Sequence, residues 1–216
     1  MIYAENILLC IASPLLLSLF FLRKTVRRFV GCTLIGMGIC LLSAYISGYM
    51  YQIVELEESE TSIFISPIVE EIMKLLPLLF VLFLFEPDDR SFMDVGLGIG
   101  VGFATFENCC YILSSGAESL PYVLVRGLAV GVMHIVTMEA VSLALVMSRR
   151  YKMLSVPGIA GALTCSMIFH ALYNLLVSEP GLSATIGYIL PIIGAAGLYA
   201  LHRANRQKQN TTVAPR

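Results

Sequence analysis

The stretch SIFISPIVEEIMKLLPLLFVLFLF, residues 62–85, decides the fold. At a rise of ~1.5 Å per residue, a helix of this length reaches across the ~30 Å apolar core of a bilayer. Three of its side chains are nevertheless charged, namely Glu70, Glu71 and Lys74. Charged groups inside a membrane helix are costly, and they usually face the bundle interior and mark a functional path or site. The stretch therefore predicts a membrane-spanning helix that carries part of a functional site.

The composition of the whole chain supports lipid as its solvent. Of the 216 residues, 57% are hydrophobic and only 13% are charged, and the mean hydropathy is +0.82. Soluble domains usually carry about 25% charged residues. These values predict an all-α polytopic membrane protein in a lipid bilayer. The chain has no basic patch with interleaved aromatic residues, so nucleic acid is not a predicted partner.

Six further apolar stretches have about the length of a membrane helix, which makes seven predicted spans in all. They cover residues 4–22, 29–51, 92–113, 121–148, 156–178 and 182–202. The connections between them are short, so we expect a single integral membrane domain over 1–216. The helices that carry the motifs described below cover about 60–178, and the polar tail 203–216 is predicted to be disordered.

Basic residues orient the predicted bundle. If seven helices alternate in direction, twelve of the fourteen Lys and Arg residues fall on one side of the membrane, and the other two lie inside spans. The rule that cytoplasmic loops are positively charged then places the N-terminus outside and the C-terminus in the cytoplasm. Six or eight spans would scatter these charges over both sides.

Polar and ionisable residues inside the predicted spans are the candidate site. They are Glu70, Glu71, Lys74, Glu107, Arg126, His134, His170 and Asn174. With the predicted topology, the glutamates and His170 lie roughly 9–13 Å below the outer surface, and His134 lies somewhat deeper. Lys74 follows Glu70 by four residues and Glu71 by three, so it can neutralise one of these carboxylates. We expect Lys74 and Arg126 to balance charge. The similar depth predicts that the three glutamates and two histidines act together, and Asn174 shares a helix face with His170, four residues before it.

Glycine and proline indicate how these helices approach one another. Gly96, Gly98, Gly100 and Gly102 are spaced by two and predict close helix packing on more than one side of their span. Pro67 and Pro77 bracket the glutamate pair and predict a kink near the site.

Glutamate and histidine in a wet pocket suit two reaction classes. In one class, a carboxylate or imidazole activates water while a second group stabilises the oxyanion. In the other, the same residue types bind a divalent metal that acidifies the water. Both classes give hydrolysis. The chain has no G-x-S-x-G and no H-E-x-x-H motif, so neither a serine hydrolase nor a zincin is predicted.

Three motifs occur in order along the spans. They are Val69-Glu70-Glu71-Ile72-Met73-Lys74, then Gly102-Phe103-Ala104-Thr105-Phe106-Glu107-Asn108, then Phe169-His170-Ala171-Leu172-Tyr173-Asn174. Together they resemble the PrsW family of bacterial intramembrane proteases, which is related to the CAAX-type prenyl endopeptidases. Lys74 stands where those endopeptidases have Arg, and Glu107 stands where they have His. Both departures are typical of the PrsW branch, and the resemblance covers residues ~60–176.

The resemblance implies a CAAX-protease-like core and an activity. It implies an endopeptidase of the bacterial inner membrane that makes the first, extracytoplasmic-side cut in a single-span anti-sigma factor during envelope stress. Glu70 or Glu71 would be the general base, held by Lys74. Glu107, His134 and His170 would either complete a glutamic-type site or join Glu71 in binding a divalent metal such as zinc. Asn174 would orient His170 or help to stabilise the oxyanion.

Two other readings of the same residues stay open. A proton- or cation-coupled transporter also places Glu and His within the membrane, although it more often has inverted repeats, and none is found here. A non-catalytic membrane protein or self-immunity factor on the same fold is the other alternative, and it would be expected to lose the water-activating residues that this chain retains.

Overall fold

The computed structural model describes residues 3–54, 57–115, 119–151 and 155–212. Within these ranges the chain is helical and has no strand. The helices are α1 (Ala4–Ser18), α2 (Lys24–Val54), α3 (Glu58–Glu60), η1 (Thr61–Ile65), α4 (Ser66–Phe85), α5 (Asp89–Ser115), α6 (Leu120–Arg150), α7 (Ser155–Ser178) and α8 (Leu182–Thr212). Each of the seven predicted spans coincides with one long helix, and α3, η1 and α4 form one continuous helical run.

Five of the helices are long and apolar enough to cross a membrane, namely those over 24–54, 89–114, 120–149, 156–178 and 182–201. The two other predicted spans differ for separate reasons. Helix α1 is apolar but has only 15 residues. Helix α4 has 20 residues, and Glu70, Glu71 and Lys74 lie so near its middle that every 18-residue stretch of it contains all three charges.

Local signals in the sequence explain where the helices begin and end. Pro121 occupies the first turn of α6, where the missing N–H is not needed, whereas Pro67 stands where η1 passes directly into α4. The Ser119 hydroxyl accepts a hydrogen bond from the Tyr122 N–H and so caps α6. Gly181, at φ +99°, makes the tight turn between α7 and α8. Helix α8 continues to Thr212, into the segment expected to be disordered, because its polar residues include good helix formers.

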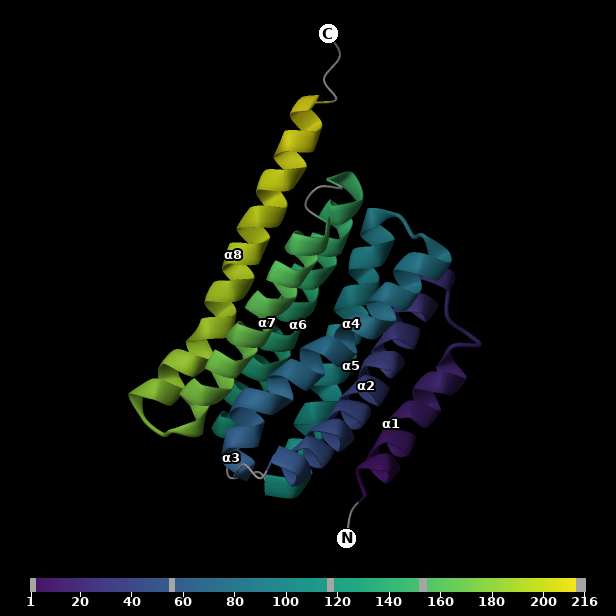
Figure 1. Cartoon of the computed structure of the whole chain (residues 1–216). Coiled ribbons are helices and arrows are strands. Elements are labelled where there is room, and N and C mark those ends of the chain that lie inside the picture. The colour runs from purple at the N-terminus through teal and green to yellow at the C-terminus, as the bar shows by residue number, and fades with distance from the viewer. Residues whose placement is uncertain (1–2, 55–56, 116–118, 152–154, 213–216) are drawn as a thin grey trace.

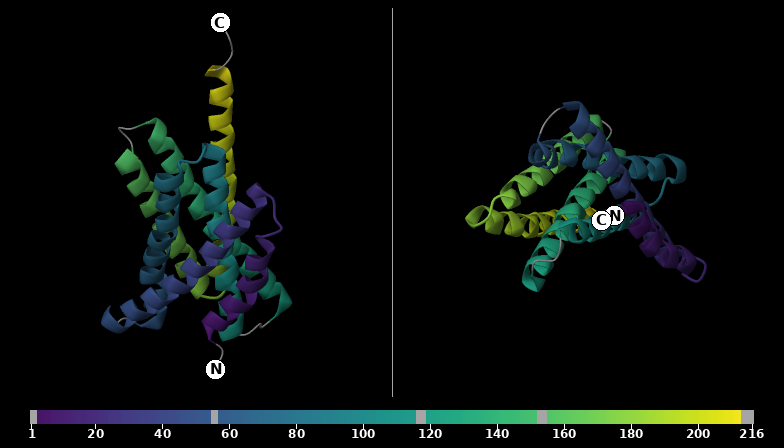
Figure 2. Two further views of the ribbon diagram at one scale, coloured as in Figure 1. Left: turned by 90° about the vertical axis from the view of Figure 1, so that its right-hand side faces the viewer. Right: turned by 90° about the horizontal axis from the view of Figure 1, so that it is seen from below.

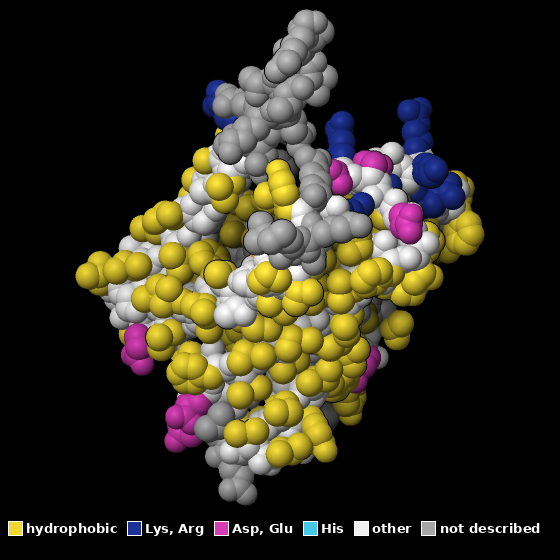
Figure 3. All heavy atoms as spheres, turned by 45° about the horizontal axis from the view of Figure 1, so that its top comes forward, with side chains coloured by type: hydrophobic (Ala, Val, Ile, Leu, Met, Phe, Trp, Pro, Cys, Tyr) yellow, Lys and Arg dark blue, Asp and Glu magenta, His cyan; other side chains and the backbone are white. Residues whose placement is uncertain are grey.

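The helices form one bundle with the two ends of the chain at opposite poles (Figure 1). Seen from below, α7 and α8 extend to one side of the bundle and α1 to the other (Figure 2, right). Hydrophobic side chains cover much of the face drawn in Figure 3, while Lys and Arg gather at the end from which α8 projects. An apolar belt between polar ends is the surface that a bilayer requires.

Helix α5 lies at the centre because its glycines let two neighbours approach closely. A Cβ at Gly102 would lie 1.9 Å from the Thr33 carbonyl oxygen of α2, and one at Gly98 would lie 2.8 Å from the Cys32 Cβ. Gly96 and Gly100 instead face α6, where Cβ atoms would meet Ser142 and the His134 carbonyl oxygen. The prediction that this glycine series permits close packing on more than one side is confirmed.

Candidate active site

Four neighbouring helices bring the predicted residues together. Helix α4 supplies Glu70, Glu71 and Lys74, α5 supplies Glu107, α6 supplies Arg126 and His134, and α7 supplies His170. A chain of ion pairs and hydrogen bonds joins all of them, and the longest link is the ion pair of Glu70 with His170 at 3.8 Å.

Lys74 is the centre of this network, and its side chain is only 1% exposed. Its Nζ lies 2.5 Å from Glu71 Oε1, 3.1 Å from His134 Nδ1 and 3.3 Å from Thr137 Oγ1. An ammonium group has three N–H donors and no acceptor. Three acceptors therefore satisfy all three donors. Lys74 pairs with Glu71, three residues before it, and makes no hydrogen bond to Glu70, four residues before it.

The contacts of Lys74 fix the tautomer of His134. Because the ammonium can only donate, His134 Nδ1 must accept, and the proton of the neutral ring lies on Nε2. That Nε2–H donates to Glu107 Oε2. Both ring nitrogens of His134 are thus engaged, one by a cation and one by a carboxylate.

His170 has the opposite arrangement and keeps one nitrogen free. Its Nδ1 lies 2.9 Å from Glu71 Oε1, and a carboxylate can only accept, so the proton lies on Nδ1. The lone pair of Nε2 then points toward Glu70 Oε2, 3.8 Å away. A carboxylate that holds the far nitrogen of a histidine is the usual support of a metal-binding imidazole.

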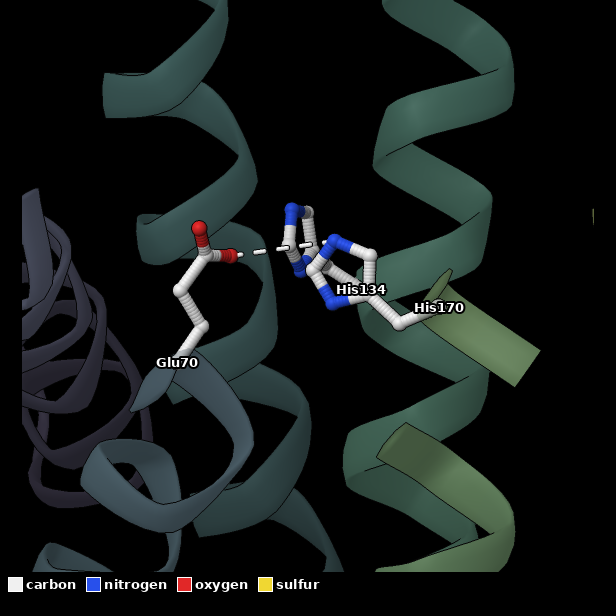
Figure 4. A group of neighbouring side chains, drawn as sticks. All are labelled: Glu70, His134 and His170. Atoms are coloured by element: carbon white, nitrogen blue, oxygen red, sulfur yellow. Dashed lines mark ion pairs between the residues drawn. The ribbon is translucent and has the colours of Figure 1, made fainter. Parts of the chain in front are cut away.

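Glu70, His134 and His170 form a group that could hold a metal ion (Figure 4). One ligand atom from each residue lies within 4.8 Å of the others. Glu70 Oε2 is buried and has no hydrogen-bond partner, although a buried carboxylate oxygen normally has one. A carboxylate oxygen and two imidazole nitrogens are also the donor types of catalytic zinc sites. The residues present therefore fit a divalent metal, provided that His134 releases one of its two present contacts.

This group differs from the predicted metal ligands, which were Glu71, Glu107, His134 and His170. Glu71 Oε1 accepts from both Lys74 and His170, and Glu107 contacts His134 and Arg126. Glu71 and Glu107 therefore lie around the group and do not belong to it. Glu70 belongs to it because Lys74 pairs with Glu71 and not with Glu70.

The side chains of the site differ in how far they are exposed. Those of Glu107 and Glu70 are 30% and 17% exposed, whereas those of Glu71, His134 and His170 are 3% exposed or less. A water or peptide that approaches the group therefore meets Glu70 and Glu107 first, with the Lys74–Glu71 pair behind them.

Comparison with known proteins gives the family. Residues 24–201 match the PrsW family, described as PrsW family intramembrane metalloprotease. The chain belongs to this family. No match was found among curated proteins or among solved structures. The match confirms the family that the three motifs indicated, and it makes this chain a multi-pass membrane protein of an intramembrane protease family. The relation to CAAX-type endopeptidases continues to rest on the motifs alone.

Arg126 is the second cation of this PrsW-family site, and it is partly buried. It donates to Asn108 Oδ1, lies 3.5 Å from Glu107 Oε1 and stacks over the Tyr111 ring at 3.5 Å. Its side chain is 12% exposed. The structure thus pairs each of the two intramembrane cations with one carboxylate, Lys74 with Glu71 and Arg126 with Glu107.

Asn174 is the one predicted site residue that the structure does not bring to the group. Its Nδ2 donates to the carbonyl oxygen of Ser62 at 2.9 Å, and no hydrogen bond joins it to His170 in the described part of the chain. Sequence reasoning also missed Thr137, which accepts from Lys74 and donates to the His134 carbonyl. Its position three residues after His134, on the same helix face, was the available signal.

Proposed function

We propose that this protein is a metal-dependent intramembrane endopeptidase that cleaves a single-span membrane protein near the extracytoplasmic side. The observation that carries the proposal is the group of Glu70, His134 and His170, in which Glu70 Oε2 is buried without a hydrogen-bond partner and faces His170 Nε2 at 3.8 Å. Family membership supports a peptidase, and the donor set supports the metal.

The proposed topology has seven spans with the N-terminus outside. Helix α4 is included because its three charges lie within the bundle, and α1 because it packs along α2 and α5 as the first helix of the bundle. The distribution of Lys and Arg supports a cytoplasmic C-terminus. In this orientation Glu70, Glu107 and His170 lie in the outer half of the bilayer, which suits a cut near the extracytoplasmic side.

Glu70, His134 and His170 would hold the metal, and Glu71 holds His170 with its proton on Nδ1. When bound, a divalent metal acts as a Lewis acid and lowers the pKa of water enough to give a nucleophile near neutral pH. Glu107 takes the proton from the attacking water, because it is the most exposed carboxylate of the site and touches His134. This proposal replaces the expectation that Glu70 or Glu71 is the base: Glu70 is assigned to the metal, and Glu71 Oε1 already accepts two hydrogen bonds with its side chain 1% exposed.

The substrate proposed from the family resemblance is an anti-sigma factor, cut first by this enzyme in the plasma membrane of a bacterium under envelope stress. The chemistry of the site supports only a peptide bond in a membrane-anchored protein. Cleavage of a panel of single-span proteins, co-expressed with the enzyme, decides between an anti-sigma factor and another substrate.

Purified protein tests the metal and the two carboxylate roles. Glu70→Gln is expected to lose both bound metal and cleavage. Glu107→Gln is expected to keep the metal and to lose cleavage by about 10²–10⁴-fold, the usual contribution of a general base. Glu139→Gln makes the same chemical change on α6 outside the site and is the matched control, expected to keep full activity. Full activity of metal-free enzyme in chelator would overturn the metal role, and full activity of Glu107→Gln would overturn the base.

A further inference from the structure

The helical run that leads into Glu70 contains a local break. Residues Thr61–Ile65 form a π-helical turn, in which the Ser66 N–H bonds to the Thr61 carbonyl oxygen. Continued by one residue, the same register would bond the Ser62 carbonyl to the N–H of residue 67. Residue 67 is proline and has no N–H. The Ser62 carbonyl therefore has no donor within its own helix.

The missing donor comes from another helix. Asn174 of α7 lies 112 residues further along the chain, and its Nδ2 donates to the Ser62 carbonyl oxygen at 2.9 Å. A backbone carbonyl left unpaired is costly, so a side chain that donates to it stabilises the segment. π-helical turns of this kind are also frequent at functional sites.

The position of this bond relative to the site gives it a second consequence. Asn174 lies four residues after His170, one turn away on the same face of α7. Ser62 lies eight residues, about two turns, before Glu70 in the run that becomes α4. The bond thus joins the two helices that carry the facing ligand atoms Glu70 Oε2 and His170 Nε2, 3.8 Å apart.

We propose that Asn174 is a positioning residue, which ties α7 to the break before Pro67 and thereby sets the spacing between Glu70 and His170. This inference rests on the proposed metal site. It gives Asn174 a different task from orienting His170 or stabilising an oxyanion, because its Nδ2 donates to Ser62 at the edge of the bundle and makes no hydrogen bond to His170 in the described part of the chain.

Asn174→Leu tests the inference, because leucine keeps the approximate shape and removes the donor. The readout is the affinity for Zn²⁺, measured by competition with a chelating dye in detergent. We expect Asn174→Leu to bind Zn²⁺ at least about 10-fold more weakly, as loss of an outer-sphere support typically does. Asn6→Leu, the same change at an exposed position of α1, is the matched control and should bind as wild type. Unchanged Zn²⁺ affinity in Asn174→Leu overturns the inference, even if cleavage is lost.

Pro67→Ala provides the second arm of the experiment. Alanine supplies an N–H at position 67, so the segment can satisfy Ser62 internally, in the π register or by returning to the α register. In this background Asn174→Leu should weaken Zn²⁺ binding by much less than in the wild type. An equal loss in both backgrounds would show that Asn174 does not act through Ser62.

Four of these proteins separate this inference from the proposed function: the wild type, Asn174→Leu, Pro67→Ala and the double variant. If wild-type protein binds no Zn²⁺, the metal-dependent function fails, and thermal unfolding of the four proteins then decides the link to Ser62. Asn174→Leu is expected to lower Tm by about 2–4 °C in the wild type and by less than half of that beside Pro67→Ala. Additive Tm changes would overturn the link.

Discussion

Replacing Lys74 with methionine removes the buried cation on which the site is built, while keeping a side chain of similar length. The change deletes three hydrogen bonds, to Glu71, His134 and Thr137, and a contact 4.9 Å from the centre of the Phe103 ring. It also removes the counter-charge of the Glu71 carboxylate, whose side chain is only 1% exposed. Breaking a buried ion pair from one side costs about 3–5 kcal/mol. Since whole proteins are stable by about 5–15 kcal/mol, this is a large share of the total.

The size of this loss is expected to depend on the charge left behind. Glu71→Gln, added to Lys74→Met, removes that charge and keeps an oxygen that accepts from His170 Nδ1. We therefore expect the double variant to recover more than half of the lost stability, because replacing both members of a buried pair is far less costly than removing one. Cleavage should stay low in both variants, since Lys74 also holds His134 through Nδ1.

Unfolding has to be followed without tryptophan, which the chain lacks. Cys32 and Cys40 are buried, so their reaction with a thiol dye reports unfolding in a background where the exposed or partly buried Cys10, Cys109, Cys110 and Cys165 are serine. A loss below about 1 kcal/mol in Lys74→Met, the value of an exposed ion pair, would refute the placement of Lys74 in a dry network. A double variant no more stable than Lys74→Met would refute the idea that the stranded carboxylate causes the loss.

Two further predictions concern packing and the second cation. Gly102→Ala should destabilise the bundle by about 1–3 kcal/mol, because its Cβ would lie 1.9 Å from a backbone oxygen of α2. Gly131→Ala, with nothing within 4 Å, should be neutral or slightly stabilising in the same unfolding assay; equal losses in the two variants would contradict the α2–α5 contact. Arg126→Ala should cost about 1–3 kcal/mol, and Arg126→Lys should restore less than half of that, since lysine lacks the planar fork that reaches Asn108 and Glu107 while stacking on Tyr111. Full restoration by lysine would mean that charge alone matters there.

The sequence by itself determined the helices, because the signals for them are local. Apolar runs of spanning length, ended by residues such as Ser119 and Gly181, are legible without knowledge of any neighbour. The glycine series 96–102 also predicted close approach, since the absence of a side chain has the same consequence whichever helix arrives. The intramembrane charges indicated a site for the general reason that lipid makes them costly.

Tertiary structure decided which of these charged and polar side chains contact one another. Helix geometry allows Lys74 to reach Glu70 or Glu71 equally well, and the acceptors on α6 together with His170 on α7 select Glu71. That choice leaves Glu70 free beside the two histidines, so a ligand set expected to include Glu71 and Glu107 became one with Glu70. The sequence also could not predict the partner of Asn174. The Ser62 carbonyl needs a donor from another helix only because a π-helical turn meets Pro67 there. Spacing along a chain limits what a side chain can reach, whereas the helices packed around it determine which of the reachable partners it takes.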